Sequence, residues 1–405
     1  MKGAPKTSAS APAYLETAAA VERFVASIGG VTTLAVDTEG ASFHRYHDRI
    51  YLLQLSTPDR HAIIDPLRAG TLDALGKIVE ARQVEVVFHD ADYDLRLLHQ
   101  DYGWHVANIF DTRIAAQLLG IRAFGLAALL EHFFSVRLNK RFQRADWSMR
   151  PLSHEMLAYA SQDTMHLLPL RERLRAALER RGRWAWAAEE FERLEGTRWD
   201  EEDPAAAFLR IKGARDLTRR ELAVLRELVP WREGVARELD RSTFRVVGNE
   251  VLLEVSRRGP ATKAELAAIK GMPRGMIETR GTAVLDAVQR GLRVVEGELP
   301  RFPKAPRWAR DPDFDDRVNR LRQVRDAKAR ELDLEPGVLC ARERLEAIAR
   351  KRADSIDALA EISELRRWQI DVLGADLVRA MGTPGSARSS NGGTSASASA
   401  GAAGA

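Results

Sequence analysis

The stretch TTLAVDTEG, residues 32–40, is a short apolar run that ends in two carboxylates two positions apart. Its composition and length predict a buried strand, and two more strand-like runs, IYLLQLST and HAIID, follow it after turn signals. A helical stretch then leads to a fourth run, VEVVF. Three successive strands and a fourth that is reached through a helix predict a mixed sheet with helices packed on it.

The rest of the chain is helical in period. From Asp92 the apolar spacing predicts helices as far as DEEDP, which breaks the pattern, so we expect an α/β domain over residues 16–205. Beyond it, ARELD occurs twice at an offset of 93 residues, and apolar positions match at the same offset. We therefore expect two copies of one small helical domain, at residues 211–293 and 312–381.

The two ends of the chain are expected to be tails. Residues 382–405 consist mainly of small and polar residues, and they have too few apolar side chains to offset the entropy lost on ordering. We expect this segment and residues 1–15 to be disordered. A proline-containing stretch, ELPRFPKAPRWARDPD, predicts a linker between the two helical copies.

The composition indicates a globular protein of two or three domains, with 405 residues of which 45% are apolar. No run approaches the roughly 18 apolar residues of a spanning helix, and the start lacks the apolar segment of an export signal. The single cysteine, Cys340, cannot form an intrachain disulfide, so we expect a reducing, cytoplasmic location without membrane attachment. The formal net charge is only +4, so nucleic acid binding would require local basic patches.

Acidic side chains follow two of the predicted strands and recur on a predicted helix. Alternation along a strand puts Asp37 and Glu39 on the same side, where two anions that lie close would repel. HDADYDL, residues 89–95, follows VEVVF, and Tyr159 and Asp163 in YASQD stand one helical turn apart. Each feature alone has a simpler interpretation, because DTEG is also typical of a turn and acids are favoured at a helix N-terminus.

Taken together, these motifs resemble those of a known superfamily. DTE, the last aspartate of HDADYDL and the YxxxD spacing of YASQD resemble the three exonuclease motifs of the DEDD superfamily, in its tyrosine-bearing subgroup. NIFDTRIAAQLLG at residues 108–120 and KRFQRADWSMRPLSHEMLAYASQD at residues 140–163 resemble the ribonuclease D family. The first helical copy resembles the HRDC domain that follows the nuclease domain in that family.

The resemblance implies a fold and a metal site. The fold is an α/β ribonuclease H-like exonuclease domain, a mixed sheet with flanking helices, followed by two small all-α HRDC-like domains. Asp37, Glu39, Asp94 and Asp163 would bind two divalent metal ions, Mg²⁺ or Mn²⁺, because such hard cations prefer oxygen ligands. In the second motif, register against the family selects Asp94 rather than the two earlier aspartates.

The same resemblance implies the activity of a metal-dependent 3′–5′ exoribonuclease that releases 5′-mononucleotides. Its expected substrate is RNA with an unpaired 3′ end, and by family analogy tRNA precursors. Tyr159 would orient the attacking water. The basic residues Lys140, Arg141 and Arg144 would either hold the phosphates of the strand or form a solvated loop.

Two alternatives to this function stay open at the level of sequence. The first is a DNA exonuclease of the same superfamily, because the metal chemistry does not depend on the sugar and no contact to the 2′-hydroxyl can be located. The second is a non-catalytic RNA-binding scaffold, which does not explain why four mutually repelling acids are present.

Overall fold

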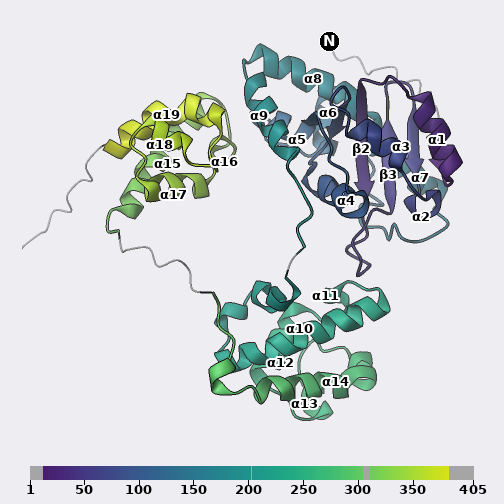
Figure 1. The fold of residues 1–405 in the computed structure, drawn as a ribbon, viewed down its shortest axis with the longest axis vertical. Coiled ribbons are helices and arrows are strands. Elements are labelled where there is room, and N and C mark those ends of the chain that lie inside the picture. Colours follow the sequence, from purple (N-terminus) through teal and green to yellow (C-terminus); the bar gives the residue numbers. More distant parts are fainter. Residues whose placement is uncertain (1–11, 202, 304–310, 383–405) are drawn as a thin grey trace, which may run out of the picture. The chain divides into compact units, whose positions relative to one another are not determined.

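The computed structural model describes residues 12–201, 203–303 and 311–382. They fall into two compact units whose boundary lies near residue 307. The first unit contains a sheet with flanking helices and a helical domain, and the second contains a further helical domain (Figure 1). Most of the expected C-terminal tail and part of the expected linker lie outside the described residues, as does most of the expected N-terminal tail.

The sheet has six strands in the order β1-β4-β3-β2-β5-β6. Strand β2 pairs antiparallel with β3 and parallel with β5, so the sheet is mixed, as predicted. The four strands predicted from the sequence are β2, β3, β4 and β5. The strands are β1 (Ala13–Leu15), β2 (Thr33–Glu39), β3 (Leu52–Ser56), β4 (His61–Ile64), β5 (Glu85–Phe88) and β6 (Ile109–Asp111).

Two short edge strands differ from the prediction. Ala13–Leu15, expected within a disordered tail, forms β1 and pairs in parallel with β4, and the Tyr14 hydroxyl donates to the Asp65 carboxylate at 2.9 Å. Ile109–Asp111, expected in a helical region, forms β6 beside β5. Three residues are too few to show a period of two, so only pairing with a neighbouring strand reveals such elements.

Helices cover both faces of the sheet (Figure 1). The alternate residues Leu34 and Val36 of β2 belong to a core cluster with residues of α1, α3 and α4. On the other face α7 packs across β2, β3 and β4. The helices of this domain are α1 (Ala18–Ser27), α2 (Pro66–Ala69), α3 (Asp73–Val79), α4 (Asp92–Tyr102), α5 (Thr112–Leu118), α6 (Leu126–Phe134), α7 (His154–Met165), α8 (Leu167–Arg180) and α9 (Trp184–Leu194).

The two helical domains have the same succession of five helices, which confirms the repeat. Helices α16, α17 and α18 each begin and end 93 residues after α11, α12 and α13. The first copy contains α10 (Arg219–Leu239), α11 (Thr243–Val246), α12 (Asn249–Arg258), α13 (Lys263–Ala267) and α14 (Arg274–Leu292). The second contains α15 (Phe314–Glu331), α16 (Pro336–Leu339), α17 (Arg342–Lys351), α18 (Ile356–Ala360) and α19 (Arg367–Gly382).

The first helical domain begins earlier than the expected residue 211. The 3₁₀ helices η1 (Pro204–Arg210) and η2 (Ala214–Asp216) precede α10, and a third, η3 (Glu296–Glu298), follows α14. Phe208 belongs to the core of this domain, where η1 packs on α10. Across the described residues, no helix is both long enough and apolar enough to span a bilayer.

Gly291 allows α10 and α14 to pack closely, and this contact gives a prediction about stability. A Cβ at this position would lie 2.4 Å from the Val224 Cα. We expect Gly291→Ala to destabilise the first helical domain by about 1–3 kcal/mol through overpacking. Hydrogen exchange of the α10 amides should detect the loss.

Gly234→Ala is the matched control, because Gly234 is exposed within α10 and a Cβ there would meet no atom within 4 Å. Removing a glycine from a helix interior should stabilise by about 0.5–1 kcal/mol. Equal exchange rates in the two variants would contradict the close approach of the helices.

Candidate active site

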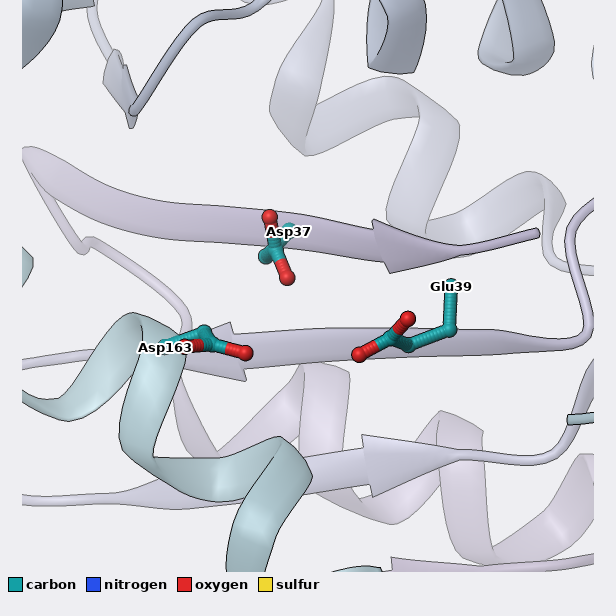
Figure 2. Close-up of side chains that lie close together, drawn as sticks. All are labelled: Asp37, Glu39 and Asp163. Atoms are coloured by element: carbon teal, nitrogen blue, oxygen red, sulfur yellow. The ribbon is translucent and has the colours of Figure 1, made fainter. Parts of the chain in front are cut away.

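Three carboxylates from two elements meet above one face of the sheet. Asp37 and Glu39 lie two positions apart on β2 and therefore point to the same face, and Asp163 descends from α7 toward them (Figure 2). Carboxylate oxygens of the three residues all lie within 4.8 Å of one another. The Ser153 side chain caps the start of α7 by accepting from the Met156 amide, which fixes where the helix begins.

The fourth expected carboxylate, Asp94, lies in the first turn of α4 and is 6% exposed. Its Oδ1 accepts from the backbone amide of Thr38 at 3.1 Å and from the Thr38 hydroxyl. Thr38 stands between Asp37 and Glu39, so Asp94 is tied to the strand that carries the other acids. It is not one of the three residues whose oxygens lie within 4.8 Å.

The two earlier aspartates of HDADYDL have different surroundings. Asp90 is exposed and forms an ion pair with Arg113, and Asp92 is exposed and pairs with Arg96 one helical turn away. Asp94 is thus the only one of the three that bonds to β2, which supports the register taken from the family. Its place in a functional site stays a prediction.

Burial sets the electrostatics of the cluster, and mutual repulsion adds to it for Asp37 and Glu39. Burial, together with the charges of Asp94 and Asp163, raises the pKa of Asp37 well above its ordinary value. Burial and the same two charges raise the pKa of Glu39. Burial raises the pKa of Asp94 and of Asp163 to about 7, although hydrogen bonds from Thr38 act to lower the pKa of Asp94.

The cluster has the composition of a divalent cation site. All its groups offer hard oxygen ligands, and in the described part of the chain no lysine or arginine forms an ion pair with Asp37, Glu39 or Asp163. Gln54 pairs with Asp37 across the β2–β3 ladder, and its buried side-chain amide has no hydrogen-bond partner among the described residues. Uncompensated anions beside an unpartnered buried amide fit a site that a cation and its ligands complete.

Tyr159 lies one helical turn before Asp163 and is held by two rings. Its ring stacks on Trp147, with centroids 6.0 Å apart, and meets the edge of Phe142 at 5.8 Å. Burial raises the pKa of the Tyr159 phenol, and the charges of Asp163 and the β2 acids raise it further. The phenol is therefore protonated at neutral pH and keeps its proton as a possible hydrogen-bond donor. Trp147 is 1% exposed, so its ring packs inside the domain.

The three basic residues expected to contact nucleic acid are exposed on the segment before α7. Arg141 forms an ion pair with Glu155 at 2.7 Å, and its guanidinium lies 5.1 Å from the Phe142 ring centroid. The backbone carbonyl of Arg144 contacts the His44 ring at 3.0 Å. Contact of these side chains with a phosphate stays a prediction.

Two residues that support the acids, Asp111 and Gln54, were not predicted from the sequence. Asp111 is 1% exposed; it caps α5 and accepts from the Ala91 amide at 2.7 Å, which fixes the turn that leads into α4. An aspartate ahead of a helical run, as in FDTRIAAQLL, is a detectable cap signal. Nothing in the sequence distinguishes Gln54 from a polar residue on an exposed strand face, because its burial depends on α7.

Comparison with known families defines the class of this protein. A family model described as 3′–5′ exonuclease matches residues 12–179, and the HRDC domain model matches residues 221–288 and 314–381. The chain is thus a 3′–5′ exonuclease followed by two HRDC domains. Ribonuclease D from Gluconacetobacter diazotrophicus is 31% identical over 84% of this chain and 85% of its own length. The chain belongs to the ribonuclease D family of 3′–5′ exoribonucleases.

Solved structures show the same architecture. The catalytic core of RRP6 from Trypanosoma brucei is 30% identical, with a TM-score of 0.62 over 71% of this chain and 82% of that one. A protein from Bifidobacterium adolescentis is 27% identical, with a TM-score of 0.79 over 92% of this chain and 97% of that one. Escherichia coli RNase D, at 24% identity, shares the fold with a TM-score of 0.71 over 91% and 98% of the two chains.

The raised carboxyl pKa values predict how stability depends on pH. The pKa of Asp163 is about 7 in the folded protein and about 4 in the unfolded chain. Folding is therefore not penalised by this group below pH about 4, and stability is lost as the pH rises through about 7, because the folded state then has to hold a buried charge. Asp163→Asn lacks one of the buried charges, so without divalent cations it should melt higher than the wild type by an amount that grows from pH 5 to pH 8. For a domain of this size each 1 kcal/mol shifts Tm by about 2–4 °C.

Thermal denaturation in EDTA at several pH values measures this difference. Added Mg²⁺ or Mn²⁺ should reduce it, because a cation stabilises the wild-type cluster more than the variant. A difference that stays constant across the range would mean that Asp163 does not titrate as described.

Proposed function

We propose that Asp37, Glu39, Asp94 and Asp163 hold two divalent cations, Mg²⁺ or Mn²⁺, and that this centre hydrolyses the terminal phosphodiester of RNA. The observation that carries the proposal is the convergence of three carboxylates within 4.8 Å, without a neutralising lysine or arginine in the described chain. When bound, the two cations would activate a water and stabilise the departing 3′ oxygen. Carboxylates that lie this close repel one another, and folding alone does not require such a cluster.

The protein's own residues would position the reactants. Asp37 and Glu39 are fixed by the ladder with β3, and Asp163 by the capped helix α7, so the ligand oxygens are preorganised. Asp94 accepts two bonds from Thr38 through one oxygen, which leaves its other oxygen available as a ligand. The metal-holding face is thus built from rigid elements.

Tyr159 would donate a hydrogen bond to the attacking water and orient it. Its raised pKa excludes a phenolate at neutral pH, so the tyrosine does not act as the base that removes the proton. Stacking on Trp147 holds the ring in one orientation, which is what positioning of a small nucleophile requires.

The proposed substrate is RNA with an unpaired 3′ end, which is shortened to 5′-mononucleotides; precursors of tRNA are the proposed physiological class. The name of several relatives, Ribonuclease D, supports RNA as the polymer. Lys140, Arg141 and Arg144 would contact the phosphates near the cluster. We also propose a cytoplasmic location, for which the buried free thiol of Cys340 is suited.

Removal of any one carboxylate tests the centre. We expect Asp37→Asn, Glu39→Gln, Asp94→Asn and Asp163→Asn each to lower hydrolysis of a 5′-labelled RNA by at least about 10²-fold, because each deletes a ligand that holds charge in the transition state. The folded state should persist, as circular dichroism can verify. EDTA should abolish the wild-type activity, and Mg²⁺ or Mn²⁺ should restore it.

Asp92→Asn is the matched control for the second motif, because Asp92 is exposed and pairs only with Arg96 in the described structure. It should retain full activity. Loss of activity in Asp92→Asn with retention in Asp94→Asn would reverse the assignment. A parallel assay on DNA of the same sequence measures the preference for the sugar.

Tyr159→Phe tests the orientation of water separately from metal binding. The substitution keeps the stacked ring and removes the hydroxyl, so we expect kcat to fall on the order of 10²-fold with little change in RNA affinity. Tyr102→Phe is the control, because Tyr102 also stacks on a tryptophan, Trp104, but belongs to a different part of the domain. Unchanged kcat in Tyr159→Phe would leave the tyrosine with a packing role only.

A further inference from the structure

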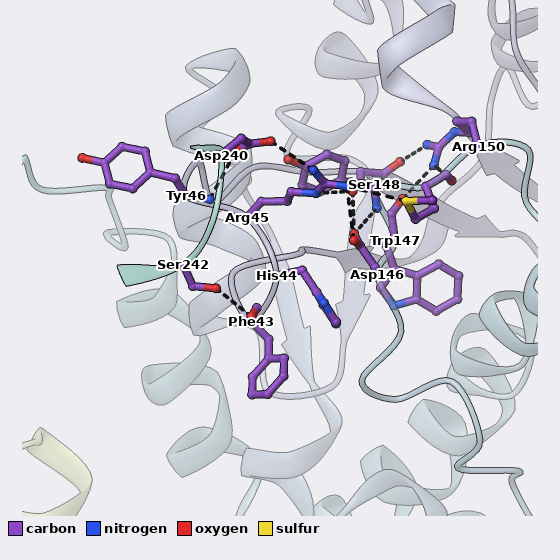
Figure 3. A network of polar contacts seen from close by, with 12 residues as sticks. Phe43, His44, Arg45, Tyr46, Asp146, Trp147, Ser148, Arg150, Asp240 and Ser242 are labelled. Atoms are coloured by element: carbon purple, nitrogen blue, oxygen red, sulfur yellow. Dashed lines mark hydrogen bonds and ion pairs between the residues drawn. The ribbon is translucent and has the colours of Figure 1, made fainter. Parts of the chain in front are cut away.

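The loop between β2 and β3, residues 40–51, is held from two sides (Figure 3). Arg45 pairs with Asp146 at 3.2 Å and donates to the Ser148 hydroxyl at 2.6 Å, both on the segment that precedes α7. On the other side the Asp240 carboxylate accepts from the Tyr46 amide at 3.2 Å, and the Ser242 hydroxyl donates to the Phe43 carbonyl at 2.6 Å. The loop therefore joins the exonuclease domain to the first HRDC domain.

Two phenyl rings meet where this loop contacts α11. The rings of Phe43 and Phe244 lie 5.2 Å apart with a tilt of 52°, yet the residues are still 48% and 49% exposed. The Arg245 guanidinium lies 5.5 Å from the Phe43 ring and 2.9 Å from His44 Nδ1. His44 in turn contacts the Arg144 carbonyl. The two rings therefore lie next to the segment that carries Lys140, Arg141 and Arg144.

We propose that Phe43, Phe244 and Arg245 form a stacking site for unpaired bases of the RNA strand whose 3′ end lies among the carboxylates. The proposal rests on the proposed function, because it assigns a path to the strand that the carboxylates would cleave. The ligand class is single-stranded RNA, contacted through base faces by the rings and through phosphate by the guanidinium.

The position of the rings suits the nucleotides just upstream of the cleaved bond. Phe43 follows Glu39 by four residues, so their Cα atoms lie at most about 14 Å apart. A stacked strand advances about 3.4 Å per nucleotide, so the rings lie within about four nucleotides of the carboxylates along the strand. Stacking does not depend on base identity, and an exonuclease that shortens any sequence needs contacts of this kind.

Packing between the two domains does not by itself explain why the rings of Phe43 and Phe244 are exposed. Trp147, an aromatic residue of the neighbouring segment, is 1% exposed, as expected for a packing role. Phe43 and Phe244 keep about half of their surface exposed although the surrounding hydrogen bonds already fix the loop. Exposed, preorganised aromatic surface beside a cation is suited to a ligand with flat apolar faces.

Affinity measurements on the full chain test the site. The probe is a ten-nucleotide oligouridine with a fluorophore at its 5′ end, titrated in EDTA and followed by anisotropy, beside an abasic strand of the same length. We expect Phe43→Ala and Phe244→Ala each to weaken binding of the decamer on the order of tenfold. The loss should be small for the abasic strand, which offers no base at the rings.

Conservative variants separate stacking from packing. Phe43→Trp keeps a flat ring and should retain the affinity, whereas Phe43→Leu keeps apolar volume without a π face and should bind as weakly as Phe43→Ala. Arg245→Ala should weaken binding of both strands, because it removes a phosphate contact. Arg258→Ala, an exposed arginine on α12 paired with Glu254, is the matched control and should bind as the wild type does.

Three results would overturn the stacking site: unchanged affinity in Phe43→Ala and Phe244→Ala, wild-type affinity in Phe43→Leu, or equal losses on the uridine and abasic strands. The second would assign the rings to domain packing. Hydrolysis of a dinucleotide by wild-type protein with Mg²⁺ tests the proposed function independently. Its absence would contradict the catalytic centre, whereas its presence with any of the three results would contradict only the stacking site.

Discussion

The mutual repulsion of carboxylates at the end of β2 is the constraint on which the rest of this structure depends. Carboxylate oxygens of Asp37, Glu39 and Asp163 lie within 4.8 Å of one another. Burial and the neighbouring charges raise the pKa of Asp37 and of Glu39, so both groups resist ionisation. Each pKa unit of such a shift represents about 1.4 kcal/mol that other interactions must supply. In the exonuclease domain these stabilising interactions are the backbone ladder of β2 with β3, the capped start of α7, and the aromatic rings packed against Tyr159.

The same constraint explains the order of the supporting elements. Asp94 can reach β2 only if the turn between β5 and α4 is fixed, and the Asp111 carboxylate fixes it by accepting from the Ala91 amide. Asp111 is the last residue of β6, so the pairing of this edge strand with β5 positions the carboxylate that fixes the turn. Parallel strands place their carboxyl ends at one edge of the sheet, which brings the ends of β2, β5 and β6 together.

The two HRDC copies share one fold but differ in residues at matching positions. Both have a glycine at the same position of the last helix, Gly281 and Gly374, where a side chain of the preceding short helix approaches. PRGM at residues 273–276 becomes RRWQ at residues 366–369, and in the second copy Trp368 and Gln369 are buried. The Gln369 amide donates to the Leu339 carbonyl at 2.8 Å, a bond that Met276 at the matching position cannot make. The loop after β2 contacts Asp240 and Ser242 of the first copy.

The sequence by itself determined the strands β2 to β5, the helical repeat and the set of candidate acids. Those features follow from local periodicity and from motifs of neighbouring residues, so they can be predicted from the sequence. Tertiary structure alone decided which side chains meet: the pairing of β1 and β6, the contact of Asp94 with Thr38, the burial of Gln54 and the approach of Phe43 to Phe244. Each joins residues from different elements, and the distance between such residues is set by packing and hydrogen bonding rather than by their separation along the chain.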